Sequence, residues 1–275
     1  MEKGTLYICP TPIGNLEDIT LRTLKVLKEV DLIAAEDTRH TIKLLNHYDI
    51  KKPLTSYHEH NIKEKGIELI EKLNQGVNIA LVSDAGMPGI SDPGEDLIKE
   101  AIEANIKVVP LPGPTASITA LIISGLATDK FTFYGFLSAK KKDRIKELQE
   151  IKDYKMTTIL YEAPHRLLNL LEAMVEILGD RKISISRELT KKYEETFRGT
   201  PKEALEKFQA SGVKGEFVIV VEGSKEEEKP EIDIEEALRA YLNQGYTKKE
   251  AVKKVVKEYN LPKNKVYRVS LEISE

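Results

Sequence analysis

Six charged side chains that could orient a substrate or move a proton stand directly after short apolar runs of this sequence. If those runs are parallel strands, the side chains lie where ligands bind, outside the carboxyl ends of the strands. A carboxylate there can accept a proton, and a neighbouring cation can assist its removal. For Glu36, Asp37 and Arg39, a capped helix with a local ion pair explains the same residues equally well. The six are Glu36, Asp37, Arg39, Glu162, Arg187 and Glu188.

A second candidate binding element is the glycine-rich stretch 79–94, in which an apolar run ends in a turn and a helix then begins. Asp92 is expected to cap that helix, with Pro93 at its first position and Glu95 closing a capping box. Glycines let the backbone bend sharply and let a ligand approach it closely. The stretch lacks the spacing G-x-G-x-x-G and a following G-K-[ST], so it is not a Walker A loop. A tight connection without a ligand is the alternative.

The sequence gives little support for a metal site or a disulfide. His58 and His60 could share a face of an extended strand, but no third ligand follows at a suitable spacing, and we predict no metal. Cys9 is the only cysteine and cannot form an internal disulfide, which favours a reducing, cytoplasmic location.

Five short apolar runs in the first half alternate with helical patterns. This alternation predicts a parallel sheet with helices on its faces. The polar, glycine and proline residues that end the runs should then gather at one edge and form a pocket. The expected strands lie near residues 5–9, 32–35, 54–57, 79–83 and 107–111, with helices at 41–48 and 95–105 among those between them.

The second half predicts a mixed sheet, because its strand patterns lie close enough in sequence for antiparallel pairs. We expect two α/β domains, 1–114 and 115–223, then a polar linker over 224–230 and a helical unit over 231–275. Helix, glycine turn, helix, short turn and helix resemble a helix-turn-helix, although a plain three-helix cap would look similar. Cations suited to phosphate contacts occur in the helical unit and in the charged run 140–144 of the second domain. The charged run could equally be the solvated start of a helix. The cations are Lys263, Lys265 and Arg268, and Lys140, Lys141, Lys142 and Arg144.

Bulk properties narrow the class of protein. The 275 residues suffice for about two domains. A net charge of −3 argues against a globally basic nucleic-acid binder but allows a local basic patch. Charges interrupt every apolar segment, so none has the length that crosses a membrane.

Six motifs stand at the ends of the apolar runs: PTPIGNLEDIT (10–20), AEDTR (35–39), SDAGMPGISDPG (83–94), PLPGPTAS (110–117), YEAPHR (161–166) and RELT (187–190). Together they resemble the ribosomal small-subunit RNA cytidine 2′-O-methyltransferase I family, a branch of the tetrapyrrole (corrin/porphyrin) methylase superfamily. The resemblance covers nearly the whole chain. It implies two α/β domains of the tetrapyrrole methylase type with the cofactor cleft between them, and a small C-terminal helix-turn-helix-like unit. It also implies S-adenosylmethionine as the donor, a homodimer, and an acceptor ribose in 16S rRNA of the assembled small subunit.

By superfamily analogy, the resemblance also assigns the donor contacts. On the acceptor side we expect the six charged residues named first, and for the rRNA phosphates the seven cations named above. A tetrapyrrole methylase acting on a small molecule, and a non-catalytic RNA-binding protein on the same fold, are the alternatives. The implied donor contacts are Pro12, Asp84, Ala85, Gly86, Met87, Pro88, Ile90, Ser91, Thr115, Ala116, Ser117, Phe133, Tyr134, Gly135, Phe136, Ala163 and Pro164.

Overall fold

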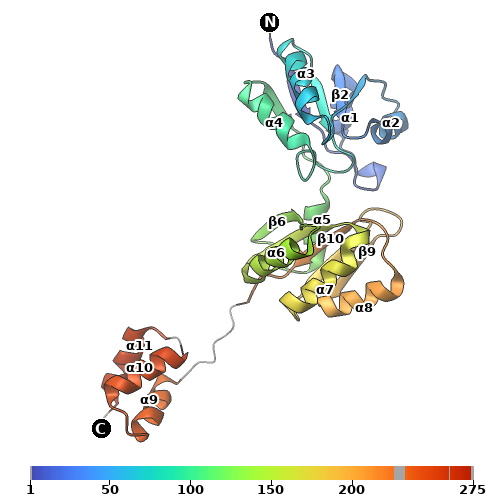
Figure 1. Cartoon of the computed structure of the whole chain (residues 1–275). Helices are drawn as coiled ribbons and strands as arrows, with labels where there is room; N and C mark the ends of the chain where they lie inside the picture. The colour runs from blue at the N-terminus through green and yellow to red at the C-terminus, as the bar shows by residue number, and fades with distance from the viewer. Residues whose placement is uncertain (1, 226–232, 260, 274–275) are drawn as a thin grey trace. The chain divides into compact units, whose positions relative to one another are not determined.

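The computed structural model describes residues 2–225, 233–259 and 261–273. By its contacts the chain divides into two compact units, Met1–Ser224 and Lys225–Glu275 (Figure 1). The first unit holds two sheets. Its division into domains 1–114 and 115–223, and the limits 231–275 of the helical unit, stay predictions. Most of the expected linker, 226–230, lies outside the described residues.

The first sheet has the strand order β3-β2-β4-β1-β5, and all four of its strand pairs are parallel. This confirms the expected five-stranded parallel sheet. Strands β2 and β4 are buried on both faces, which explains why they appear in the sequence as short unbroken apolar runs. The strands are β1 (Thr5–Ile8), β2 (Leu32–Ala35), β3 (Leu54–Ser56), β4 (Ile79–Val82) and β5 (Lys107–Pro110).

Helices cover both faces of this sheet. Helices α1 (Leu21–Glu29) and α2 (Thr38–His47) pack on one face, and α3 (Ile62–Asn74) and α4 (Gly94–Glu103) pack on the other (Figure 1). The neighbouring strands β1 and β4 therefore send their connections to opposite faces of the sheet. In open α/β sheets a binding crevice forms outside the carboxyl ends at such a point.

Two helices of this half begin elsewhere than expected. Helix α2 begins at Thr38 instead of residue 41, because the Asp37 side chain accepts the Arg39 N–H and caps it. Helix α4 begins at Gly94 with Pro93 as the cap residue, so the expected Asp92 cap is wrong by one position. The Asp92 carboxylate instead accepts the N–H groups of Gly89 and Gly94, both at 2.8 Å. It thereby ties the glycine-rich loop to the start of the helix.

The second sheet has the order β6-β7-β10-β8-β9, in which β6 and β7 are parallel and the other pairs antiparallel. The expected mixed sheet is confirmed. Helix α5 (Ala116–Ser124) packs on one face, and α6 (Lys141–Asp153), α7 (Leu167–Leu178) and α8 (Pro201–Ser211) pack on the other. The strands are β6 (Phe131–Phe136), β7 (Thr157–Glu162), β8 (Ile183–Arg187), β9 (Glu195–Gly199) and β10 (Phe217–Val221); the short 3-10 turns of the unit are η1 (Leu16–Asp18) and η2 (Pro164–Arg166).

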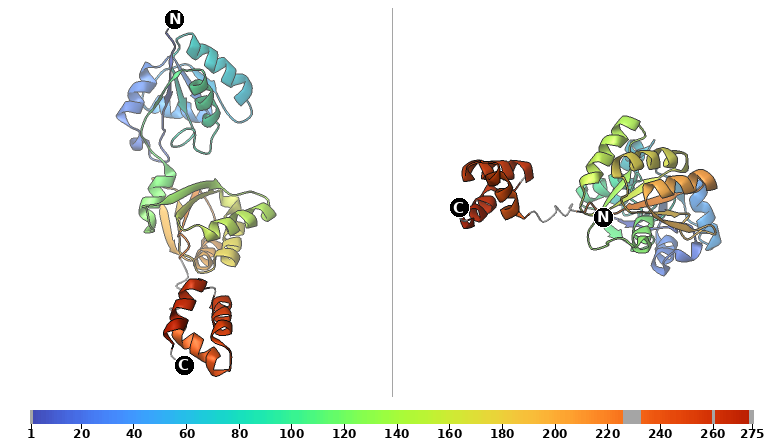
Figure 2. Two further views of the ribbon diagram at one scale, coloured as in Figure 1. Left: turned by 90° about the vertical axis from the view of Figure 1, so that its left-hand side faces the viewer. Right: turned by 90° about the horizontal axis from the view of Figure 1, so that it is seen from below.

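The second unit contains helices α9 (Ile234–Asn243), α10 (Lys248–Tyr259) and α11 (Lys263–Glu272), which surround their own core (Figure 2). The expected capping box is present: the N–H of Thr247 donates to Glu250, and the N–H of Glu250 donates back to the Thr247 hydroxyl. Within the described residues, every helix is too short or too polar to cross a bilayer.

Candidate active site

A cavity of about 810 Å³ opens where the loops after β1, β2, β4 and β5 meet strands of the second sheet. The first sheet contributes the carboxyl ends that the topology singles out. The second sheet contributes parts of β6, β7 and β10 and the connections that follow β7 and β8. Most expected donor contacts lie in its wall, namely Ala85, Gly86, Met87, Ile90, Ser91, Thr115, Ala116, Ser117, Phe133, Phe136, Ala163 and Pro164.

The glycine-rich loop is fixed to the loop after β1. The N–H of Thr11 donates to the carbonyl of Gly86 at 2.9 Å, and the N–H of Gly86 donates back at 3.0 Å. The Thr11 hydroxyl adds a bond of 3.1 Å to the Ser83 carbonyl. Gly86 has φ +80°, and a Cβ there would lie 3.3 Å from the Ile13 side chain. The two loops thus form one closely packed wall, in which a side chain at position 86 would strain the backbone and press on Ile13.

Five expected donor contacts do not line the cavity: Pro12, Asp84, Pro88, Tyr134 and Gly135. Asp84 turns toward the loop after β2, where its carboxylate accepts the Asp37 N–H at 3.0 Å. Tyr134 packs against the core on the opposite side of the second sheet. The β6 register shifts between Phe133 and Gly135, and this bulge brings Phe133 and Phe136 to the same face despite their odd spacing.

With Asp92, whose carboxylate ties the glycine-rich loop, Glu36 is one of two carboxylates that the first sheet places at the cavity. Its Oε2 accepts the N–H of Asp84 at 3.2 Å. Burial raises the pKa of Glu36; the Asp84 N–H opposes this, and the carboxylates of Asp84 and Asp92 add to it. A raised pKa makes a carboxylate at a cavity wall a stronger base, and so better suited to accept a proton, than a carboxylate in water.

Asp37 and Arg39 do not line the cavity. Arg39 lies 88% exposed and pairs with Asp37 at 2.7 Å. The Arg39 side chain lowers the pKa of Asp37 to about 2, with further help from the Arg39 N–H. These two residues therefore have the alternative arrangement considered above, a helix cap with a local ion pair.

Glu162 is a carboxylate that the second sheet places in the cavity wall, and its side chain is fully buried. Its Oε1 accepts the Ala163 N–H at 2.9 Å and lies 3.1 Å from Nε of Arg166. Its Oε2 has no hydrogen-bond partner among the described residues. Burial raises the pKa of Glu162, against the effects of the Ala163 N–H and Arg166.

Arg187 and Glu188 lie outside the cavity wall, although Leu189 between Glu188 and Thr190 is part of it. Arg187 pairs with Glu195 at 2.6 Å. Glu188 accepts Nζ of Lys191 at 3.0 Å and the N–H of Glu216 at 3.2 Å. Both side chains are thus engaged in holding the connection after β8.

Sequence reasoning missed about half of the wall. Ser83, Asp92, Tyr161 and His165 stand inside the quoted motifs, so that signal was available, whereas an apolar strand such as β10 gives no sign of facing a ligand. The unassigned wall residues are Ile13, Ser83, Asp92, Ile118, Phe131, Tyr161, His165, Leu189, Glu216, Phe217 and Val218.

The expected basic run is only partly exposed. Three of its cations are exposed, namely Lys140, Lys141 and Lys142. Arg144 is buried, and its guanidinium donates to the carbonyl of Ala139 at 3.5 Å. Its expected place on a solvated basic surface is wrong, because it shares the inner face of α6 with Leu148 and Ile151.

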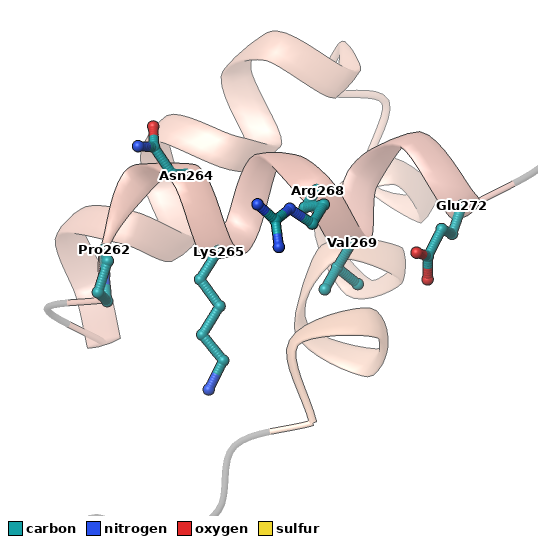
Figure 3. Close-up of a pocket in the computed structure, with 6 residues that line it drawn as sticks. All are labelled: Pro262, Asn264, Lys265, Arg268, Val269 and Glu272. Atoms are coloured by element: carbon teal, nitrogen blue, oxygen red, sulfur yellow. The ribbon is translucent and has the colours of Figure 1, made fainter.

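In the second unit, Lys263, Lys265 and Arg268 are exposed on α11. A hollow of about 360 Å³ runs along the surface of this helix (Figure 3). Lys265 and Arg268 line it, and Glu272 lines it one turn further along. Across the described parts of both units, His, Cys, Asp and Glu form no group of three that could hold a metal ion.

Comparison with known proteins assigns the family. The family model "Tetrapyrrole (Corrin/Porphyrin) Methylases" matches residues 5–205. The ribosomal RNA small subunit methyltransferase I of Bacillus subtilis is 52% identical over 97% of this chain and 94% of its own length. The chain belongs to the ribosomal RNA small subunit methyltransferase I family. The member from Synechocystis is 49% identical over 98% of both chains.

A solved structure shows the same fold as this chain. It is the uroporphyrin-III C-methyltransferase of Thermus thermophilus complexed with S-adenosylhomocysteine. It matches with a TM-score of 0.57 at 15% identity, over 79% of this chain and 97% of its own. The tetrapyrrole methylase fold expected from the motifs is therefore confirmed.

Proposed function

We propose that this protein transfers the methyl group of S-adenosylmethionine to the ribose 2′-hydroxyl of a cytidine in 16S rRNA. The observation that carries the proposal is the cavity, which lies at the carboxyl edge of a parallel sheet in a chain about half identical, over its full length, to named rRNA methyltransferases. Two cavity carboxylates with raised pKa values supply groups for the acceptor side.

The cavity fits the donor in size and lining. At about 810 Å³ it lies in the upper part of the range of roughly 300–1,000 Å³ for small-molecule sites, which leaves room for part of a nucleotide beside the donor. Apolar walls from Ala85, Met87, Ala116 and Phe133 suit an adenine and a thioether chain. When bound, S-adenosylmethionine supplies a methyl group activated on a sulfonium sulfur. We assign its binding to the seventeen donor contacts named above, of which Pro12, Asp84, Pro88, Tyr134 and Gly135 act by supporting the wall.

The chain's own part in the reaction is alignment, exclusion of water and proton transfer. Methyl transfer from a sulfonium is an in-line displacement, and alignment alone contributes roughly 7–11 kcal/mol. The 2′-hydroxyl is a weak nucleophile at neutral pH, so a nearby base helps it to react. We assign this acceptor side to Glu36 and Glu162, and the positioning of its loops to Asp37, Arg39, Arg187 and Glu188.

Exposed cations would hold the rRNA phosphates. Lys140, Lys141 and Lys142 serve in the first unit and Lys263, Lys265 and Arg268 in the second, while the buried Arg144 supports its helix. Each neutralised phosphate adds about 0.7–0.9 to the slope of log affinity against log salt. Removal of residues 231–275 should therefore weaken rRNA binding and flatten its salt dependence. Unchanged affinity would make the helical unit purely structural.

We also propose that the protein acts in the cytoplasm as a homodimer on the assembled small subunit. The resemblance supports all three points, and the 69% exposed Ile122 supports an apolar contact between copies. Light scattering of the purified protein measures the dimer. Comparing free 16S rRNA with intact subunits as acceptors tests the preference for the assembled particle.

The decisive experiment incubates the purified protein with labelled donor and undermethylated small subunits, and then maps the modified nucleotide. Label in a cytidine ribose supports the proposal; label in a tetrapyrrole acceptor alone, or no donor binding by calorimetry, refutes it. Among alanine variants, E36A and E162A should lose turnover with donor still bound, whereas D37A should keep most of it. Full turnover in E36A and E162A would remove both carboxylates from the chemistry.

A further inference from the structure

The connection between β8 and β9, residues 188–194, contains two strained positions. Glu188 has φ +52° and Thr190 has φ +64°, in the left-handed region that side chains other than glycine seldom adopt. For a β-branched residue such as threonine this conformation is an outlier. Strained residues persist only where their surroundings hold them, and they concentrate at functional sites.

Contacts on both sides hold this segment in place. The Thr190 hydroxyl accepts the N–H of Asn15 at 3.0 Å, which links the segment to the loop after β1. The N–H of Thr190 donates to the Glu194 carboxylate at 2.5 Å, so the segment also closes on itself. Leu189, between the two strained residues, is buried against Ile13, and both side chains line the cavity.

The next residues of the same segment face solvent. Lys192 and Tyr193 are exposed, and Tyr193 keeps 70% of its surface accessible. Nζ of Lys192 lies 5.6 Å from the centre of the Tyr193 ring. An exposed aromatic ring beside a cation is the combination with which proteins bind single-stranded nucleic acid, because every base has a face that can stack on the ring. Neither residue has a role in the site described above.

We propose that segment 188–194 is a nucleotide-binding rim of the cavity, on which Tyr193 stacks with a base of the rRNA strand and Lys192 contacts an adjacent phosphate. The inference rests on the proposed function. A ribose that reaches a cavity lined by Leu189 must come from a strand lying close to this segment, and bases displaced from their stack are held by aromatic side chains. The strained backbone at Glu188 and Thr190 fixes the distance between the cavity wall and the exposed ring.

The test compares Y193A, Y193F and K192A in methylation of undermethylated small subunits. Y193A should raise KM for the subunits about tenfold, Y193F should stay within about twofold of wild type because it keeps the ring, and the donor Kd by calorimetry should not change. K192A should lower the salt slope of subunit binding by about 0.7–0.9. Exposed Lys152, at the far end of α6, provides the charge-matched control K152A.

The outcomes separate the two proposals. A wild-type protein that transfers no methyl group to the subunits refutes the proposed function and the rim with it. A wild-type protein that does so, with Y193A unchanged in KM, refutes the rim alone. A K192A effect no larger than that of K152A would likewise overturn the phosphate contact.

Discussion

Removing the carboxylate of Glu162, at the end of β7, is expected to destabilise the first unit strongly because its ion pair with Arg166 of η2 is buried. The Glu162 side chain is fully buried and that of Arg166 is 20% exposed, with 3.1 Å between Oε1 and Nε. Breaking such a buried pair leaves an uncompensated charge and costs about 3–5 kcal/mol. Because the Arg166 guanidinium keeps its bond to the Leu137 carbonyl, we expect about 3 kcal/mol for E162A.

Thermal unfolding measures this cost. For a unit of this size 1 kcal/mol corresponds to about 2–4 °C, so the Tm of E162A should fall by roughly 6–12 °C. The matched control is E29A, which breaks an i,i+4 pair of 3.9 Å between side chains that are 72% and 63% exposed. Exposed helix pairs contribute about 0.3–0.5 kcal/mol, which predicts a fall of at most about 2 °C. Equal shifts in the two variants would show that burial of the Glu162 pair has no energetic consequence.

A second variant, E162Q, tests the direction of the pKa shift. Burial raises the pKa of Glu162 above its ordinary value of 4.5, so the folded protein binds this proton more tightly than the unfolded chain. The resulting stability is fully present below about pH 4.5 and is lost as the pH rises through the folded pKa. The amide of E162Q does not titrate. Its Tm relative to wild type should therefore rise between pH 4.5 and neutral pH, and a relative Tm that falls over this range would contradict the shift.

Three further predictions follow from named contacts. G86A should weaken donor binding about tenfold by calorimetry, because φ is +80° and a Cβ would press on Ile13 at 3.3 Å; unchanged affinity would show that the wall is not in contact with the donor. R144A should lower Tm by at least about 5 °C because it removes a buried side chain that packs inside α6 and its bond to the Ala139 carbonyl, whereas K142A should leave Tm unchanged and reduce only the salt slope of rRNA binding. Cys9 is fully buried and desolvation raises the pKa of its thiol to about 12, so a disulfide reagent at pH 8 should label it only after denaturation.

The sequence predicts the sheets better than it predicts the side chains in the site. Strands β2 and β4 are buried on both faces and leave unbroken apolar runs, and the alternation of such runs with helical patterns located all five strands of the first sheet. Arg144 illustrates the limit of arguing from charge alone. It stands four residues before Leu148 and seven before Ile151, on the inner face of α6. Helical periodicity therefore predicts that Arg144 is buried, whereas the run of cations around it suggests an exposed surface.

The site shows a second limit. Alternation along a strand predicts opposite faces for Phe133 and Phe136, and only the bulge at Gly135 brings both rings to Tyr161. Likewise, Asp37 follows β2 as directly as Glu36 does, yet a helix cap uses its carboxylate. Whether a side chain faces the ligand depends on local features such as a bulge or a helix cap. The spacing of residues along the chain does not show where these features occur.

The bond between Asn15 and Thr190 joins residues 175 positions apart, and this separation bears on how the protein matures during translation. At about 5–20 residues per second, the loop after β1 waits roughly 9–35 s on the ribosome before its partner has been synthesised. The wall that carries Val218 is made later still. A growing chain therefore cannot enclose the methyl donor early, and retention of the donor would be a sensitive reporter of completed synthesis.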